Sequence, residues 1–310
     1  MNDWGERLGV NEFLPPVPIY LPFQAGAYRP AMGLIAQNLA QLTAFDDQYL
    51  EQMAQRRLLL ATRRDEVLAA TPGSGAMCAE ALAVLVAHLC ADRAAWFSRC
   101  GDILTNHLTG ETWALDRLDG DRLAVAGRLV VEDICLLTPA PCPLLAAAVL
   151  CFPSRWRLAD KIGQPLSAIH GPVPDYARAL SGPVDRFLGL LKPGRLVARM
   201  NWSIHDDPAL FQPEADHPHR AITTANAGAM LTLRIERQTL SRLPQTGAIM
   251  FTIRTYQHRL SAVAAVPGAA ASLLGALAGL PDAVASYKGI SGFRAALERY
   301  LAGFAGVDEA

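Results

Sequence analysis

The chain has 310 residues, of which 51% are hydrophobic and 18% are charged, and its formal net charge is −1. This length supplies one large domain or two small ones, with enough apolar material for a core. A charge balance near zero argues against nucleic acid or an anionic membrane as a partner.

The cysteines and the first residues bear on the cellular compartment. Six cysteines are scattered without a CxxC pair, and four lie in apolar or helical contexts, as is typical of reduced thiols. The start, MNDWGERLG, lacks the basic and apolar regions of a signal peptide. No stretch is expected to reach the roughly 18 apolar residues of a membrane span, and Ala262–Leu280 comes nearest. We therefore predict a cytoplasmic protein without a membrane segment.

The first third of the chain predicts an arm followed by helices. Residues 1–30 are rich in proline and aromatic residues, which indicates an extended arm whose apolar side chains cover another part of the protein. A helical pattern runs from about Leu34 to Ala69, and a second helix is predicted over 76–99. His88, within the second helix, is interpreted as a structural histidine.

The middle of the chain changes to strand patterns. Asp119-Gly120 between the runs 111–115 and 122–125 predicts a β-hairpin. The run 132–137 predicts a short helix or the entry to a strand, and 144–152 predicts a buried strand.

The remainder predicts a sheet followed by helices. A helix is expected over 183–192, with Pro183 in its first turn and Gly194 beyond its end. Strands are expected over 195–204, 229–240 and 247–256, the last two as an antiparallel hairpin. Helices are expected from Arg259 to Phe304. This order predicts an α+β protein with an antiparallel sheet core flanked by N- and C-terminal helices. Its predicted division is an N-terminal arm with helices (1–100), a sheet domain (101–260) and C-terminal helices (261–310).

His170 is the first candidate for a functional residue. It precedes Gly171-Pro172-Val173-Pro174, and these prolines predict an extended, stiff segment that sets the direction of the imidazole. A metal ligand needs this property, and a structural histidine has it too, so both interpretations stay open. The spacings His205-Asp206-Asp207 and His217-Pro218-His219 are compatible with metal binding, but their prolines indicate surface loops.

The predicted hairpin carries a row of polar residues. Alternation places Arg234, Glu236 and Gln238 on one face of the first strand, and Thr252, Arg254 and Tyr256 on one face of the second. If the two strands pair, one sheet face is expected to carry both rows, and this face is either a solvated face or a site whose guanidinium groups bind carboxylates. The chain contains no P-loop, GxGxxG, HExxH or GxSxG motif.

Several motifs together resemble one known family. The run CFPSRW…K.G…IHGPVP, the motif Arg199-Met200-Asn201-Trp202 and the run LRIERQTLSRLPQTGAIMFTIRTY look like the haem-dependent oxidative N-demethylase family. Tyr28-Arg29-Pro30 and Asp46-Asp47-Gln48-Tyr49 fit it as well, so that the resemblance covers about residues 20–260.

The resemblance implies a fold and an activity. The fold would be a PAS-like sheet core at about 105–258 that binds a b-type haem without a covalent bond. The activity would be the oxidative removal of a methyl group from a small alkylamine with dioxygen, releasing formaldehyde. Its electrons would come from flavin and iron–sulfur modules on a separate reductase, because this chain has neither a ferredoxin cysteine pattern nor a dinucleotide fingerprint. Two rivals stay open, a haem-binding sensor or carrier without turnover and a haem-free structural subunit.

The resemblance also assigns roles to residues. His170 would be the axial ligand of the haem iron, with His205 and His258 as alternatives. Glu236 would offset the charge of the amine, or it would only pair with Arg234 or Arg254 across the sheet, and Tyr256 would be a hydrogen-bond partner of the substrate. Trp202 would lie at the cofactor. Some of five arginines would pair with the haem propionates: Arg155, Arg199, Arg234, Arg237 and Arg254.

Overall fold

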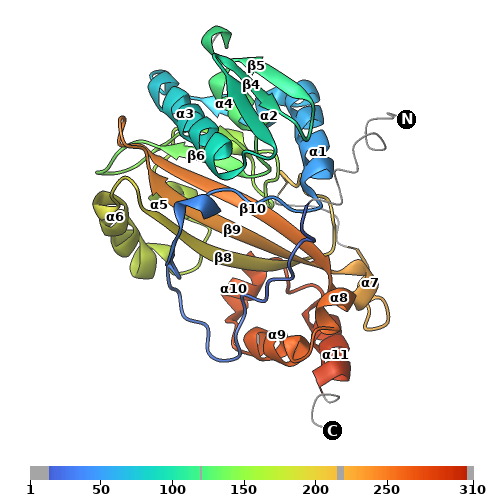
Figure 1. Cartoon of the computed structure of the whole chain (residues 1–310). Helices are drawn as coiled ribbons and strands as arrows, with labels where there is room; N and C mark the ends of the chain where they lie inside the picture. Colours follow the sequence, from blue (N-terminus) through green and yellow to red (C-terminus); the bar gives the residue numbers. More distant parts are fainter. Residues whose placement is uncertain (1–13, 119–120, 215–219, 306–310) are drawn as a thin grey trace.

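The centre of the fold is one antiparallel sheet. The structure, a computed structural model, describes residues 14–118, 121–214 and 220–305. Seven strands follow the order β1–β8–β9–β10–β6–β7–β2, with helices on both sides (Figure 1). The predicted α+β class is confirmed. These strands are β1 (Ile35–Gln37), β2 (Leu68–Ala70), β6 (Asp133–Leu137), β7 (Leu145–Val149), β8 (Leu196–His205), β9 (Thr232–Arg242) and β10 (Ile249–Arg259).

A second, smaller sheet and the helices surround this centre. The small sheet has the order β3–β4–β5, formed by Phe97–Cys100, Ile103–Asn106 and Glu111–Ala114. The helices are α1 (Tyr49–Thr62), α2 (Arg64–Val67), α3 (Gly75–Asp92), α4 (Arg122–Ala126), α5 (Leu166–Ile169), α6 (Ser181–Leu190), α7 (Ala227–Met230), α8 (Leu260–Ala264), α9 (Ala269–Ala278), α10 (Asp282–Tyr287) and α11 (Arg294–Ala305), with a π-helix at Tyr176–Leu180.

Two helical groups cover one face of the large sheet. Near β6 and β7, Met53 of α1 and Leu85 of α3 are buried in one core with Leu136. At the other end, the C-terminal helices α8, α9 and α11 bury apolar side chains against Ile235 of β9. Figure 1 shows these two groups at opposite ends of the long strands β8–β10. The face is therefore closed by helices that are far apart in the sequence.

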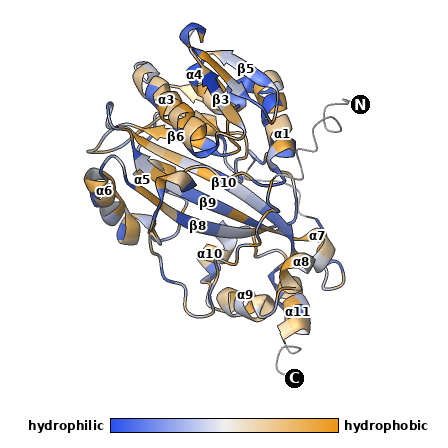
Figure 2. Cartoon of the chain, viewed as in Figure 1, coloured by the Kyte–Doolittle hydropathy of each residue, from blue (hydrophilic) through white to orange (hydrophobic). Residues whose placement is uncertain are grey.

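The other face is covered by the segment between β7 and β8. Leu166 of α5 and Leu188 of α6 are buried with Leu137 and Ile249. Because both faces of the sheet are covered here, β6 and β7 are buried along their whole length and read as continuous apolar runs. We call the buried apolar residues between this segment and the sheet the third core. The strands β8 and β9 carry hydrophilic residues in the middle of the fold (Figure 2), so a polar region lies beside the third core.

The predicted N-terminal helices are partly wrong. Within 34–69, helix begins only at Tyr49, and Ile35–Gln37 is instead the edge strand β1 on β8. The second helix ends at Asp92, and Phe97–Cys100 pairs with β4. The strand β1 depends on a partner that is distant in the chain, so tertiary pairing overrides the local pattern there, whereas β3 forms a local hairpin with β4.

The predicted hairpin around 119–120 is also wrong. Its turn residues lie outside the described part of the chain, but its second arm, Arg122–Ala126, is helix α4. Its first arm is β5, which pairs with β4. By contrast, the strands β8, β9 and β10 and the hairpin of β9 with β10 confirm the prediction closely.

The segment after His170 is not extended. His170 ends α5, because its N–H bonds to the carbonyl of Leu166, and its own carbonyl accepts from Val173. Asp175 adopts a left-handed conformation (φ 61°), and the π-helix then begins at Tyr176. The prolines therefore shape a tight turn rather than an extended run.

The arm and the membrane prediction have different outcomes. In the described part of the arm, Leu14 and Phe23 are buried, as expected of a covering segment.

The prediction that no stretch reaches membrane-spanning length is wrong, because Gly75–Asp92 is one helix in the described residues that is long and apolar enough by composition. In this fold it packs as α3, where Leu82, Leu85 and Leu89 are buried in the core. The PAS-like comparison and the three-part division of the chain stay predictions.

Candidate functional site

A cavity of about 450 Å³ lies between the third core and the polar stretches of β8 and β9. This volume is within the usual range of ~300–1,000 Å³ for small-molecule and cofactor sites. Its apolar half comes from β6, β7, β9, β10, α5 and α6: Cys135, Leu137, Leu145, Leu166, Ile169, Val184, Phe187, Leu188, Leu240, Phe251 and Ile253. Its polar half comes chiefly from β8, β9 and the segments beside them: Ser154, Arg155, Arg199, Asn201, Ser203, His205, Glu236, Gln238 and Lys288.

His170 lines this cavity at the end of α5. Its Nδ1 lies 2.9 Å from the carbonyl oxygen of Leu166, which only accepts, so Nδ1 carries the proton and Nε2 keeps its lone pair. Nε2 has no hydrogen-bond partner among the described residues. Burial lowers the pKa of His170, and Lys161 and Arg199 add to this effect. The neutral imidazole is the form that coordinates a metal ion.

His205 also lines the cavity, but both of its ring nitrogens are occupied. Its Nδ1 lies 3.0 Å from Oε1 of Gln212, an acceptor, so Nδ1 donates. Its Nε2 then accepts from the hydroxyl of Ser203 at 2.9 Å. Burial lowers the pKa of His205 to about 3, with the charges of Arg234 and Arg155 as further causes. His205 is therefore a neutral, hydrogen-bonded part of the cavity floor.

The third candidate histidine lies elsewhere. His258, near the end of β10, is absent from the cavity lining among the described residues. It pairs with Leu233 across the sheet, and burial lowers its pKa. Of the three candidates, His170 alone combines a place in the cavity with a free, unprotonated nitrogen.

Arg199 is the cation in the cavity without a fixed partner. It projects from β8, and the described residues include no hydrogen bond or ion pair to its guanidinium. Burial lowers its pKa, whereas the nearby charge of Glu236 opposes this shift. A half-buried, unpaired guanidinium is suited to a carboxylate of a ligand.

Two further cations are held by the protein. Arg155 adopts a left-handed conformation (φ 62°) and donates to Asp206 at 3.0 Å. Lys288, which directly follows α10, donates to the carbonyl of Trp202 and to Oδ1 of Asn201. Burial lowers the pKa of Lys288 to about 8, while Glu236 opposes the shift and Arg199 adds to it.

Glu236 is the one acidic side chain among the described residues that line the cavity. Its Oε2 accepts from Gln238 at 3.0 Å, and its Oε1 lies 3.6 Å from Nε of Arg234. With Arg199 and Lys288 nearby, the carboxylate has a strongly cationic environment.

The prediction that one sheet face carries both polar rows of the hairpin is wrong. Arg254 pairs with Arg237, and Thr255 with Glu236, so each pair joins an even-numbered to an odd-numbered residue. Arg254 and Tyr256 therefore lie on the face opposite Glu236. The error arose because the register of the hairpin depends on the geometry of its turn.

Three of the five predicted arginines are committed to other partners. Arg254 makes a bidentate ion pair with Asp46 at 2.7 and 2.8 Å. Arg237 donates to the carbonyl of Gln41. Arg234 shares the face of Glu236, but it is fully buried beyond the cavity, where it donates to the carbonyls of Leu210 and Phe152.

The two predicted aromatic residues also lie on the opposite face. Tyr256 packs against Tyr20, with ring centroids 5.0 Å apart, and under the guanidinium of Arg254. Trp202 packs edge-on against Phe23, and Lys288 lies 4.8 Å from the centroid of its ring. Trp202 therefore supports a cavity residue without lining the cavity.

Other cavity residues were not predicted. Lys288 and Tyr287 come from the C-terminal helices, and Tyr28 comes from the arm. No local motif distinguishes Lys288 in the sequence. Lys161, which donates to the carbonyl of Ile169 at 2.7 Å, and Tyr176 belong to the stretch around His170. Their closeness to His170 in the sequence was the only feature from which their place in the cavity could have been predicted.

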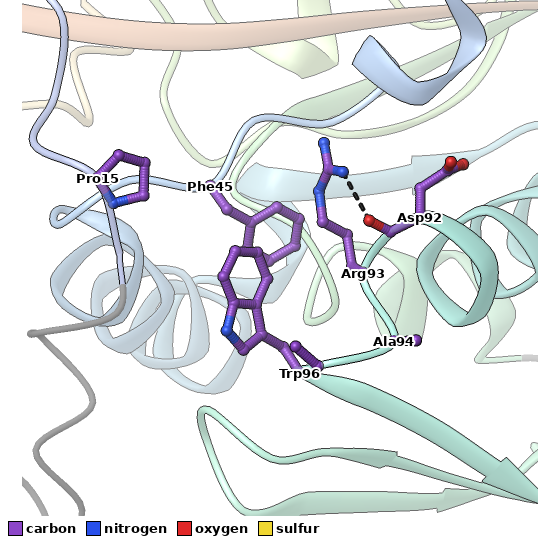
Figure 3. A pocket seen from close by; sticks show the side chains of 7 residues that line it. Pro15, Phe45, Asp92, Arg93, Ala94 and Trp96 are labelled. Atoms are coloured by element: carbon purple, nitrogen blue, oxygen red, sulfur yellow. Dashed lines mark hydrogen bonds between the residues drawn. The ribbon is translucent and has the colours of Figure 1, made fainter.

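A second pocket lies at the C-terminal end of α3, beside the turn that follows this helix. Figure 3 shows Phe45 and Trp96 side by side, with Arg93 next to them and Pro15 at the edge. It measures about 210 Å³, and Arg93 is engaged by the carbonyls of Ala40 and Thr43. Neither pocket holds a cluster of three or more His, Cys, Asp or Glu ligands within the described residues. His217 and His219 lie outside them.

Comparison with known families connects the chain to a family of enzyme subunits by name. A family model described as haem-dependent oxidative N-demethylase, alpha subunit-like, matches residues 33–298. The matched residues begin after the motif Tyr28-Arg29-Pro30. They extend past the last motif, which ends at Tyr256, and they include α10 and Lys288.

Proposed function

Because the chain belongs to the haem-dependent oxidative N-demethylase, alpha subunit-like family, we propose that its cavity binds haem with Nε2 of His170 as the axial ligand. The observation that carries this proposal is the state of the imidazole: Nδ1 is held by the carbonyl of Leu166, and Nε2 lies inside a cavity without a hydrogen-bond partner in the part of the chain that the structure describes. A histidine ligand normally donates its other N–H to such an acceptor, which fixes tautomer and ring orientation.

The residues of the cavity fit a haem. Its apolar half suits the macrocycle, and Arg199 is available for a propionate. Arg155, Lys161 and Lys288 add positive charge to the same cavity. These contacts replace the earlier expectation for Arg234, Arg237 and Arg254, whose partners are within the protein.

The proposed reaction is the oxidative N-demethylation of a small alkylamine with dioxygen, and a separate flavin and iron–sulfur reductase supplies the electrons. When bound, the haem supplies the iron that activates dioxygen. Glu236 contributes the negative charge that compensates a cationic amine in a partly apolar cavity. The apolar wall of α5 and α6 limits access of water to the reacting methyl group.

Reconstitution tests the proposal. The purified protein with added haemin should show a sharp Soret band at one haem per chain, and His170→Ala should lose it or shift it strongly. Added imidazole should restore the band in the variant. A variant with full haem content and an unchanged ferric spectrum would show that another residue is the ligand. Release of formaldehyde from dimethylamine, dioxygen and a reductant then separates an enzyme from a haem-binding sensor.

A further inference from the structure

Tyr176 is stacked on the imidazole of His170. The two ring centroids lie 4.5 Å apart, and the planes are inclined by only 12°. The Tyr176 side chain is buried and lines the same cavity. A parallel stack of this kind restricts rotation of the smaller ring.

The hydrogen bond of His170 alone does not fix its ring plane. The bond from Nδ1 to Leu166 holds one atom at 2.9 Å, but a ring attached through a single bond can still rotate about that contact. A second contact on the ring face removes this freedom. Tyr176 supplies it among the described residues.

The backbone between the two residues turns back on itself and so brings their rings together. Val173 bonds back to His170, and Tyr176 bonds back to Val173, so the chain folds over itself. Asp175 is in the left-handed region, which is unfavourable for a residue with a side chain. The π-helix starts at Tyr176, and such irregular turns frequently occur at functional sites.

The hydroxyl of Tyr176 does not explain its position. This oxygen is buried and has no hydrogen-bond partner among the described residues, which is an unfavourable state for a polar group. The hydroxyl therefore makes no contact that holds the side chain in place, which leaves the stack of the ring on His170 as the interaction that defines its position.

We propose that Tyr176 is the positioning residue of the axial ligand: its ring holds the His170 imidazole in the plane in which Nε2 faces the cavity. This inference rests on the proposed function, in which His170 binds haem iron. Outer partners of a metal-binding histidine typically change metal affinity about 10- to 100-fold when they are removed.

Three variants test the role of the ring. Tyr176→Leu removes the aromatic plane, Tyr176→Phe keeps it without the hydroxyl, and Tyr300→Leu removes a tyrosine ring that packs on Phe304 outside the cavity. Transfer of haem to excess apomyoglobin should be about 10- to 100-fold faster for Tyr176→Leu. It should stay close to the wild-type rate for Tyr176→Phe and Tyr300→Leu. The ferric electron paramagnetic resonance signal should broaden only in Tyr176→Leu, because the imidazole of His170 can then adopt more than one orientation.

A measurement without haem separates this inference from the proposed function. In the apoprotein, nuclear magnetic relaxation of the imidazole C–H groups should report a rigid His170 ring, and Tyr176→Leu should make this ring more mobile, while the nitrogen chemical shifts keep the tautomer that the bond to Leu166 fixes. Loss of the Soret band in Tyr176→Leu but not in His170→Ala would mean that His170 is not the ligand. Equal haem release from Tyr176→Leu and the wild type, or equal acceleration in Tyr176→Phe, would overturn the positioning role of the ring.

Discussion

Arg56 and Asp133 form an ion pair of 2.6 Å in which both side chains are completely buried. The carboxylate of Asp133 also accepts from the backbone N–H groups of Cys151 and Phe152, at 2.6 and 3.0 Å. Arg56 belongs to α1, so the pair joins this helix to the segment that continues into the cavity wall at Arg155. The pair therefore ties helix α1 to the segment that leads into the cavity wall.

Removal of Arg56 should be costly. We expect Arg56→Ala to lower the free energy of unfolding by about 3–5 kcal/mol, because Asp133 would keep a buried charge without its partner. Arg63→Ala is the matched control, since Arg63 and its partner Glu66 are each 47% exposed. The control should lose less than about 1 kcal/mol in the same urea titration. Equal losses in both variants would contradict a special role of the buried pair.

The neutral state of His205 makes stability depend on pH. Its folded pKa of about 3 lies below its ordinary value of 6.5, so the unfolded chain binds more protons between these values. The stabilisation is fully present above the unfolded pKa and is lost as pH falls towards the folded one. Within this window His205 should contribute a slope of up to about 1.4 kcal/mol per pH unit.

His205→Gln should remove most of this slope. Urea unfolding of wild type and variant at a series of pH values should give curves that converge as pH falls. His107→Gln is a suitable control, because His107 bonds to the exposed side chain of Ser98. An undiminished slope in His205→Gln would assign the pH dependence to other groups.

The fold was predictable where the alternation of side chains along a strand is long enough to indicate the strand that later pairs in the sheet. The strands β8, β9 and β10 are long, and their side chains alternate, so the sequence locates them to within a few residues. The strands β1 and β3 have three and four residues and exist because β8 and β4 lie beside them. The pairing of β1 with β8 is a tertiary effect that no local period reveals, whereas β3 and β4 form a local hairpin whose turn was not recognised in the sequence.

The site was predictable where its residues belong to a compact motif or to a long strand, and His170, Arg199 and Glu236 all line the cavity. His170 was found because it lies in a compact motif. The hairpin residues Arg254 and Tyr256 were placed on the wrong face, since a shift of one residue in register moves every side chain across the sheet. Lys288 reaches the cavity through the packing of the C-terminal helices, and this arrangement has no signature in the sequence.

Arg199 provides a test of carboxylate recognition. Arg199→Lys keeps the charge but loses the planar fork, so haem retention should fall. A hydrogen bond to a charged group contributes about 1.5–3 kcal/mol, which corresponds to roughly 10- to 100-fold in affinity. Arg237→Lys is the control, because Arg237 lies on the opposite face. Haemin titration measures both, and identical affinities in the two variants would remove Arg199 from the propionate site.

Gly289 tests the contact between the C-terminal helices and the cavity wall. It has φ +67°, and an added Cβ would overlap Nη1 of Arg155. Gly289→Ala should cost about 1–2 kcal/mol from its backbone conformation alone, and it should displace Arg155 and weaken haem binding. Gly292→Ala is the control, because it has open space and no positive φ. If thermal denaturation and haemin titration cannot separate the two variants, Gly289 does not hold Arg155 in place.

The last prediction concerns Glu236 and the amine. In the proposed role its carboxylate offsets the charge of a bound alkylamine, so Glu236→Gln should keep the haem spectrum and the fold but weaken amine binding at least about 10-fold. The alternative role is a local one, in which Glu236 only pairs with Arg234 and Gln238, at 3.6 and 3.0 Å. In that case the variant should lose thermal stability and bind amine as before.

Titration with dimethylamine, followed at the Soret band, separates these two roles of Glu236. Glu298→Gln serves as the control, because Glu298 pairs with Arg294 on the C-terminal helix α11. The control should leave the dissociation constant unchanged. The cationic surroundings of Glu236 make the test demanding, since Arg199 and Lys288 repel a protonated amine and only the carboxylate attracts it. An unchanged dissociation constant in Glu236→Gln, together with a lower melting temperature, would show that Glu236 stabilises the sheet and does not bind the substrate.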